Sequence, residues 1–180
     1  MHRILDRKTL MEAFACLDRH VPGKKSAHLV LGGGAAMIAA YDHRLATRDV
    51  DATTARGGLR MADLAAASRA VAEEMDLEPD WLNPHFEVYT PVLPSDYGTR
   101  LRRVFEGERL RVDALGPEDL LLMKCFAGRD KDLSHARKLV RMAQDLDVVD
   151  RRLAELGERG YPGAARAADA FDDLRDEVEG

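Results

Sequence analysis

The chain has 180 residues and a formal net charge of −5, with 46% hydrophobic and 33% charged residues. These values are typical of one globular domain, or one domain with a small appendage, and they exclude disorder along the whole chain. No apolar run approaches the roughly 18 residues needed to cross a bilayer, and the N-terminus lacks an apolar stretch, so we expect neither a membrane span nor a secretory signal.

Cys16 and Cys125 are the only cysteines. Two isolated thiols are expected to make neither a disulfide framework nor a zinc site, and they suit a reducing cytoplasm, where we expect the protein. The net charge argues against a protein that coats nucleic acid, which would be basic overall. Residues 100–141, however, carry a net charge of +4 and residues 145–180 a net charge of −6, so the middle of the chain is locally basic.

The first part of the chain mixes helical and extended patterns. Residues 10–21 repeat apolar side chains at intervals of three and four, which predicts a helix. Residues 27–31 form a short apolar run that predicts a buried strand, and a helix of small residues is expected at 35–40. A second strand is predicted at 48–53 and an amphipathic helix at 64–75.

Further along, residues 81–84 predict a loop and residues 86–90 a strand. Residues 99–105 and 109–115 predict the two strands of a hairpin. Pro117 suits the first position of a helix, and only helices are predicted after it, at residues 118–127, 132–143, 149–156 and 167–178.

These elements predict an α/β (α+β) fold with a small mixed sheet flanked by helices. Because the pattern changes near residue 116, we expect an α/β domain at 1–115 and a helical C-terminal portion at 116–180 packed on it.

A glycine turn joins the first predicted strand to the helix after it. Gly32, Gly33 and Gly34 leave the N–H groups at the helix start free to face an anion, and they let a phosphate approach the backbone. Close packing of strand and helix explains the glycines almost as well. No Walker A ending occurs, and Met37 stands where a dinucleotide fingerprint needs glycine or alanine.

Asp49 and Asp51 are two residues apart in the second predicted strand. Residues i and i+2 of a strand share a face, so we expect both carboxylates to project side by side and Arg48 to point the other way. Two such carboxylates repel each other unless a cation lies between them, and Mg²⁺ prefers oxygen ligands. A solvated strand face is the alternative for an Asp-x-Asp pattern on its own.

Together, these features resemble the opening of the nucleotidyltransferase fold shared with DNA polymerase β. More narrowly, Gly33-Gly34-Ala35-Ala36-Met37 followed by Arg44-x-x-Thr47-Arg48-Asp49-Val50-Asp51 resembles bacterial nucleotidyltransferase-like families related to the AbiEii and MenT toxins. Residues 81–83, 115–124 and 127–133 look like later landmarks of an uncharacterised branch of that group. The resemblance runs from about residue 27 to residue 140.

The resemblance implies that a nucleoside triphosphate (NTP) lies over the glycine turn. Asp49 and Asp51 would hold the catalytic Mg²⁺ or Mn²⁺, and Gly33 and Gly34, with the hydroxyl of Thr47 as a weaker candidate, would hold phosphate. An acceptor hydroxyl would attack the α-phosphate and pyrophosphate would leave, with catalysis by positioning and metal neutralisation of charge.

A third carboxylate usually completes such a site, where it binds metal or takes the acceptor proton. Asp113 fits this role between two apolar neighbours, and Glu87 fits it nearly as well; we prefer Asp113.

Lys124 lies on a mostly apolar predicted helix. Its position alone favours an ammonium that extends to solvent, whereas the resemblance implies that it holds triphosphate. The resemblance also places Arg129 and Asp132 near the nucleotide. Related sequences often carry a second acid three residues beyond Asp132, where this chain has His135.

Two further sets of residues are less informative. None of the histidines has a His-x-x-x-His spacing, so we interpret them as surface or locally satisfied residues: His2, His20, His28, His43, His85 and His135. Strand alternation is expected to place on one face most of the hairpin arginines: Arg100, Arg102, Arg103, Arg109 and Arg111. That face could be an ordinary solvated surface, a surface that follows RNA phosphates, or a docking surface for an acidic partner.

The sequence thus predicts a metal-dependent nucleotidyltransferase that transfers NMP from an NTP to a hydroxyl. The resemblance implies the toxin of a toxin–antitoxin or phage-defence pair, with tRNA as acceptor and an antitoxin protein as partner. Two alternatives stay open: a nucleotidyltransferase that modifies a small molecule such as an antibiotic, and a catalytically silent domain that binds a protein partner or a nucleotide.

Overall fold

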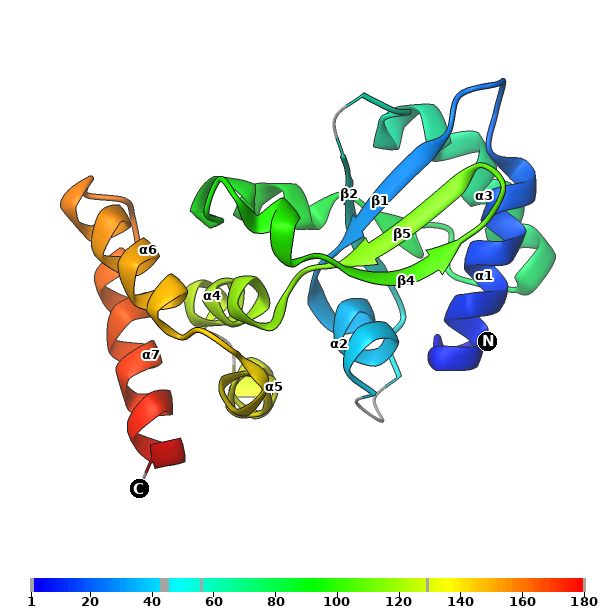
Figure 1. Cartoon of the computed structure of the whole chain (residues 1–180). Coiled ribbons are helices and arrows are strands. Elements are labelled where there is room, and N and C mark those ends of the chain that lie inside the picture. Colours follow the sequence, from blue (N-terminus) through cyan, green and yellow to red (C-terminus); the bar gives the residue numbers. More distant parts are fainter. Residues whose placement is uncertain (1, 43–45, 56, 129, 180) are drawn as a thin grey trace. The chain divides into compact units, whose positions relative to one another are not determined.

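The structure is a computed structural model that describes residues 2–42, 46–55, 57–128 and 130–179, without the side chains of residues 130–133 and 179 (Figure 1). The chain divides into two compact units: Met1–Val88 with Leu101–Leu115, and Tyr89–Arg100 with Gly116–Gly180. Within the described ranges, every helix is too short or too polar to span a bilayer.

The first unit contains a five-stranded mixed sheet in the order β3-β2-β1-β5-β4. β1 is antiparallel to β2 and parallel to β5, β2 is parallel to β3, and β4 and β5 form the expected antiparallel hairpin. The strands are β1 (Ala27–Leu31), β2 (Val50–Thr54), β3 (Leu82–Asn83), β4 (Arg102–Glu106) and β5 (Leu110–Ala114), and the helices are α1 (Arg7–His20), α2 (Gly33–Tyr41), η1 (Met61–Leu64) and α3 (Ala65–Met75). The predicted α/β (α+β) fold class is confirmed.

One face of the sheet is apolar and packs against helices. Leu31 is fully buried, and the ring of Phe14 on α1 lies 6.2 Å from that of Phe105 on β4, measured between centroids. On the same side, the guanidinium of Arg102 lies 4.9 Å from the ring centroid of Tyr41 on α2. The apolar spacing of α1 therefore predicts the correct buried surface.

The other face of the sheet carries polar groups. Val30 of β1 is paired with Thr53 of β2 and with Asp113 of β5, and Asp113 is paired with Arg103 of β4. Paired residues of neighbouring strands point to the same side, and alternation places Asp51 on the side of Thr53. This face, called the polar face below, therefore brings together acids from segments that are far apart in the chain.

Two aspartates fix α1 in the first unit. Asp6 is the N-cap and accepts a hydrogen bond of 2.8 Å from the backbone N–H of Thr9. Near the other end of the helix, the carboxylate of Asp18 accepts backbone N–H groups from the β4–β5 turn, those of Glu108, Arg109 and Leu110. The hairpin is thereby attached to α1 through its turn.

Two predictions about the segment after α3 are wrong. The predicted loop at 81–84 contains β3, and the predicted strand at 86–90 is the 3-10 helix η2 (His85–Val92). The backbone N–H of Glu87 donates to the carbonyl of Pro84 at 2.8 Å, and Pro91 lacks the N–H that a strand would need. Phe86 is 1% exposed and Val88 is 70% exposed, so the apolar alternation does not mark one buried strand face.

The second unit is helical, as predicted for the chain beyond residue 116 (Figure 1). Pro117 begins α4, and Gly128 ends it in the left-handed conformation with a φ of 60°. The carboxylate of Asp119 is fully buried and accepts two hydrogen bonds, of 3.0 and 2.9 Å, from the guanidinium of Arg100. The elements of this unit are η3 (Tyr97–Arg100), α4 (Pro117–Ala127), α5 (Asp130–Met142), α6 (Asp147–Glu158) and α7 (Ala164–Glu179).

Candidate functional site

The glycine turn lies directly against one of the predicted metal ligands. Gly33 has a φ of 58°, in the left-handed region, and a Cβ atom placed on it would lie 2.4 Å from Oδ2 of Asp51. The backbone N–H of Gly32 donates to the carbonyl of Asp51 at 2.9 Å. Both the conformation and the close approach therefore favour glycine at position 33.

Thr47 and Asp49 lie beside the same turn. A Cβ atom placed on Gly34 would lie 3.4 Å from Oγ1 of Thr47. This hydroxyl donates to Oδ1 of Asp49 at 3.0 Å. Thr47 is itself held by two backbone hydrogen bonds with Leu5, of 2.8 and 3.0 Å. The structure therefore gathers the turn, Thr47, Asp49 and Asp51 within the first unit.

Asp49 and Asp51 do not both lie in the strand predicted at residues 48–53. β2 begins at Val50, so Asp51 lies in the strand while Asp49 and Arg48 precede it. Strand alternation therefore fixes the direction of the Asp51 side chain only. The position of Asp49 is instead defined by its hydrogen bond to Thr47, and its side chain is exposed.

Sequence reasoning did not find His85 as a neighbour of Asp51. Its Nδ1 lies 3.9 Å from Oδ1 of Asp51, with the two side chains 74% and 28% exposed. His85 begins η2, which follows β3, and β3 pairs with β2 through Asp51 and Asn83. The only signal in the sequence was its place beside the Trp81-Leu82-Asn83 landmark.

Asp113 lies on the polar face as a buried acid with several basic partners. Its side chain is 1% exposed. Oδ1 accepts from Nε of Arg103 at 2.7 Å, while Oδ2 lies 2.7 Å from Nε2 of His28 and accepts from Nε of Arg111 at 2.8 Å. Burial opposes ionisation, but the hydrogen bonds from Arg111, Arg103 and His28 outweigh it and lower the pKa of Asp113.

Glu87, the other candidate for the third carboxylate, lies in η2 rather than in a strand. Its side chain is exposed and accepts a long hydrogen bond of 3.4 Å from Oγ1 of Thr53. Among the residues that the structure describes, neither Asp113 nor Glu87 joins Asp49 and Asp51 in a group whose ligand atoms all lie within 4.8 Å of one another. The identity of a third metal ligand stays a prediction.

A cavity of about 800 Å³ opens in the first unit close to Asp51. His85, which faces Asp51, lies on its wall together with Thr53, Glu87 and residues of α3 such as Ser68. The hydroxyl of Ser68 is buried and has no hydrogen-bond partner. A volume of this size is in the range of small-molecule sites.

The hairpin arginines do not form the single face that alternation predicted. Arg103 and Arg111 lie on the polar face beside Asp113, whereas Arg102 stacks on Tyr41 on the opposite side. Arg100 belongs to η3 of the second unit, where it pairs with Asp119. β4 begins only at Arg102, so Arg100 lies outside the strand, and the adjacent strand residues Arg102 and Arg103 point to opposite faces.

The remaining predicted site residues belong to the second unit or lie outside the described parts. Lys124 is buried on α4, with 7% exposure, so its ammonium does not extend freely to solvent. Arg129 lies outside the described residues, as does the side chain of Asp132. His43 and Arg44, quoted above from the sequence, also lie outside them.

The comparisons with known proteins agree with this arrangement at the level of family. Residues 8–169 match the family model described as "Nucleotidyltransferase of unknown function (DUF6036)". No curated protein and no solved structure matches this chain. Because the family model covers most of the chain, including the glycine turn and the acidic residues of the polar face, this protein belongs to the DUF6036 family of nucleotidyltransferases of unknown function.

Proposed function

We propose that this protein is a metal-dependent nucleotidyltransferase that transfers NMP from an NTP to an acceptor hydroxyl. The observation that carries the proposal is the contact between the glycine turn and Asp51, which leaves 2.4 Å between Oδ2 and a Cβ atom built on Gly33. A turn that strongly favours glycine, at the start of a helix and against a carboxylate, suits a phosphate bound with a metal ion. Membership of a nucleotidyltransferase family supports the same reaction.

Asp49 and Asp51 are the residues that would hold the metal. Both offer carboxylate oxygens, which Mg²⁺ and Mn²⁺ prefer, and both are accessible, since Asp49 is exposed and Asp51 is 28% exposed. A bound Mg²⁺ would neutralise charge on the α-phosphate while the acceptor oxygen bonds to phosphorus and pyrophosphate leaves. Thr47 would position Asp49 through the hydrogen bond to Oδ1.

The cavity next to Asp51 is where we place the organic part of a substrate. His85, which faces Asp51, lies on its wall together with the polar side chains of Thr53 and Glu87. The link between the cavity and the proposed metal ligand is His85, which lines the cavity and lies 3.9 Å from Asp51.

For the acceptor we propose tRNA, in the setting of a toxin held in check by an antitoxin protein. This part of the proposal is supported by the resemblance of the glycine and Asp-x-Asp segments to the AbiEii and MenT toxins. Expression of the protein alone is then expected to slow growth, and Asp49→Ala is expected to relieve the effect. A variant that stays toxic without Asp49 would refute the toxin role.

The decisive assay incubates the purified protein with each α-³²P-labelled NTP, Mg²⁺ and total tRNA. Asp51→Asn keeps the size of the side chain and removes its charge, so it tests the metal ligand with little change in packing. We expect label in tRNA with the wild type, and a loss of at least about a hundredfold with Asp51→Asn, because metal neutralisation is central to this chemistry.

Three other outcomes separate the alternatives. Label that appears only when a small hydroxylated molecule such as an aminoglycoside is added would assign a small-molecule acceptor. Mg²⁺-dependent NTP binding by calorimetry without any transfer points to an acceptor not yet supplied. Absence of both NTP binding and transfer would refute the proposal and favour a silent domain that binds a protein partner.

A further inference from the structure

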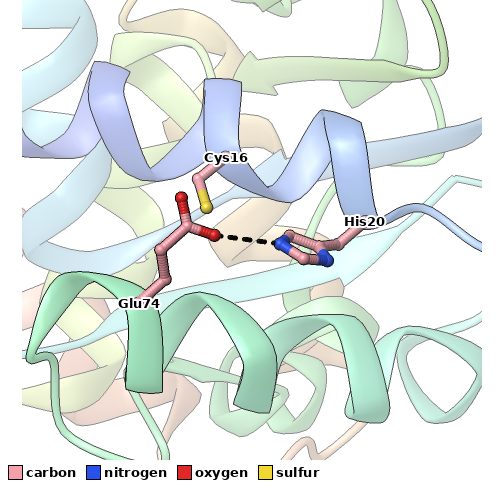
Figure 2. Close-up of side chains that lie close together, drawn as sticks. All are labelled: Cys16, His20 and Glu74. Atoms are coloured by element: carbon pink, nitrogen blue, oxygen red, sulfur yellow. Dashed lines mark hydrogen bonds and ion pairs between the residues drawn. The ribbon is translucent and has the colours of Figure 1, made fainter.

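A second group of potential metal ligands lies between α1 and α3. Cys16 and His20 are four residues apart on α1, so they share one face of the helix, and Glu74 faces them from α3 (Figure 2). The ligand atoms of the three side chains all lie within 4.8 Å of one another. Nε2 of His20 is 3.1 Å from Oε2 of Glu74, and the sulfur of Cys16 lies within 4.8 Å of the ligand atoms of both.

We propose that Cys16, His20 and Glu74 form a zinc site. A thiolate, an imidazole and a carboxylate are the three side-chain types that bind Zn²⁺, and three protein ligands leave the fourth tetrahedral position to water. The mixture of sulfur and nitrogen donors selects against Mg²⁺ and Ca²⁺, which prefer oxygen. The cysteine count had suggested that no zinc site exists, but one cysteine suffices when a helix presents a histidine one turn further on.

A neighbouring arginine holds the carboxylate of Glu74 from its other oxygen. The guanidinium of Arg19 donates to Oε1 of Glu74 at 2.9 Å, while Oε2 faces His20. A metal bound through Oε2 would leave the Arg19 contact intact, and such an outer contact fixes the direction of a ligand. Cys16 is 2% exposed, while His20 and Glu74 are exposed, so a metal could reach the group from solvent.

This site is separate from the one proposed for nucleotide. Thr47 pairs with Leu5 just before α1 begins, whereas Cys16 lies nine residues after the first helical residue, about 14 Å along the helix axis. A metal bound there would join the C-terminal half of α1 to the C-terminal half of α3. The zinc site therefore does not depend on the proposed transfer reaction.

A purely ionic cluster is the competing account. The ion pairs from His20 and Arg19 to Glu74 would form without any metal. In the metal-free protein, burial and the hydrogen bond to Glu74 raise the pKa of the Cys16 thiol to about 11, so zinc binding would displace a proton from sulfur. Only direct metal binding through sulfur distinguishes the two accounts.

The experiment titrates the metal-free full-length protein with Co²⁺ and then with Zn²⁺ against a chromogenic zinc indicator. We expect one equivalent of Co²⁺ to give the sulfur-to-cobalt charge-transfer band of a tetrahedral thiolate site. Cys16→Ser should abolish the band, and His20→Ala and Glu74→Gln should each weaken zinc binding by at least about tenfold. The matched control is Cys125→Ser, which changes the other buried cysteine and should keep the band.

A charge-transfer band that is absent from the wild type, or that survives Cys16→Ser, would overturn the proposal. If Cys16→Ser does not fold, His20→Ala and Glu74→Gln test the proposal instead. A zinc affinity that is unchanged in both variants would also overturn the zinc site. Zinc binding is measured without nucleotide, so it can succeed or fail independently of the transfer assay.

Discussion

Substitution of Gly33 by alanine tests whether the glycine turn and Asp51 are packed as described. The left-handed φ of 58° costs a residue with a Cβ atom about 1–2 kcal/mol. The new Cβ would also lie 2.4 Å from Oδ2 of Asp51, so that side chain must leave its rotamer at a cost of about 1 kcal/mol. We therefore expect Gly33→Ala to lower the free energy of unfolding by about 2–3 kcal/mol.

Two further variants separate backbone strain from the contact. Gly23 has a φ of 67° with nothing within 4 Å of an added Cβ, so Gly23→Ala should cost about 1–2 kcal/mol from strain alone. Asp51→Ala removes Oδ2 and Cγ and leaves only Cβ, at 3.4 Å. In that background, the cost of Gly33→Ala should fall to the cost of Gly23→Ala.

Trp81 provides the measurement because it is the only tryptophan, is fully buried and lies in the first unit. Urea unfolding followed by its fluorescence gives the free energy of unfolding for each variant. Equal costs for Gly33→Ala and Gly23→Ala, or no relief in the Asp51→Ala background, would refute the packing of Asp51 against the turn.

Three other predictions follow from single contacts. Asp18→Ala should lower the free energy of unfolding by about 2–4 kcal/mol, because three backbone N–H groups of the hairpin turn lose a charged acceptor; a loss below about 0.5 kcal/mol in urea unfolding would contradict this. Hydrogen bonds from Thr9 lower the pKa of the N-cap Asp6, so its stabilisation is full above about pH 4 and is lost as the pH falls through the lowered value; unfolding of Asp6→Ala and wild type should therefore differ by about 1 kcal/mol at pH 7 and converge in acid. Ala65→Trp, which narrows the cavity, should reduce nucleotide transfer at least about tenfold, whereas Ala66→Trp, exposed on the same helix but outside the cavity wall, should not; equal rates would exclude the cavity from the reaction.

The sequence pattern predicted the secondary structure correctly where the structure of an element depends on its own residues. The apolar repeat of α1 and the Pro117 and Gly128 boundaries of α4 are properties of single segments, and each is confirmed. The strand predicted at residues 86–90 is wrong, because Pro84 and Pro91 flank that segment. Proline removes a ladder donor, and that effect outweighs β propensity.

The contacts of the polar face and of the proposed zinc site join residues far apart in the sequence, and no local sequence pattern predicts them. His28 and Asp113 are 85 residues apart and meet because β1 and β5 are parallel neighbours. Glu74 reaches His20 across 54 residues through the packing of α3 on α1. The spacing of Cys16 and His20 was visible in the sequence, but its meaning required the third side chain.

The surroundings of the two strand acids on the polar face bear on where a metal would bind. Asp113 is 1% exposed and already accepts hydrogen bonds from two guanidiniums. A metal ion bound there would have to lose its water and displace one of these guanidiniums, which are already in place. Asp51 is 28% exposed and lies near the exposed Asp49, where a hydrated Mg²⁺ can keep several of its waters. If a metal binds Asp49 and Asp51 as proposed, substrate phosphate and water would complete its ligands, while Asp113 holds the β4–β5 hairpin to β1 through Arg103 and His28.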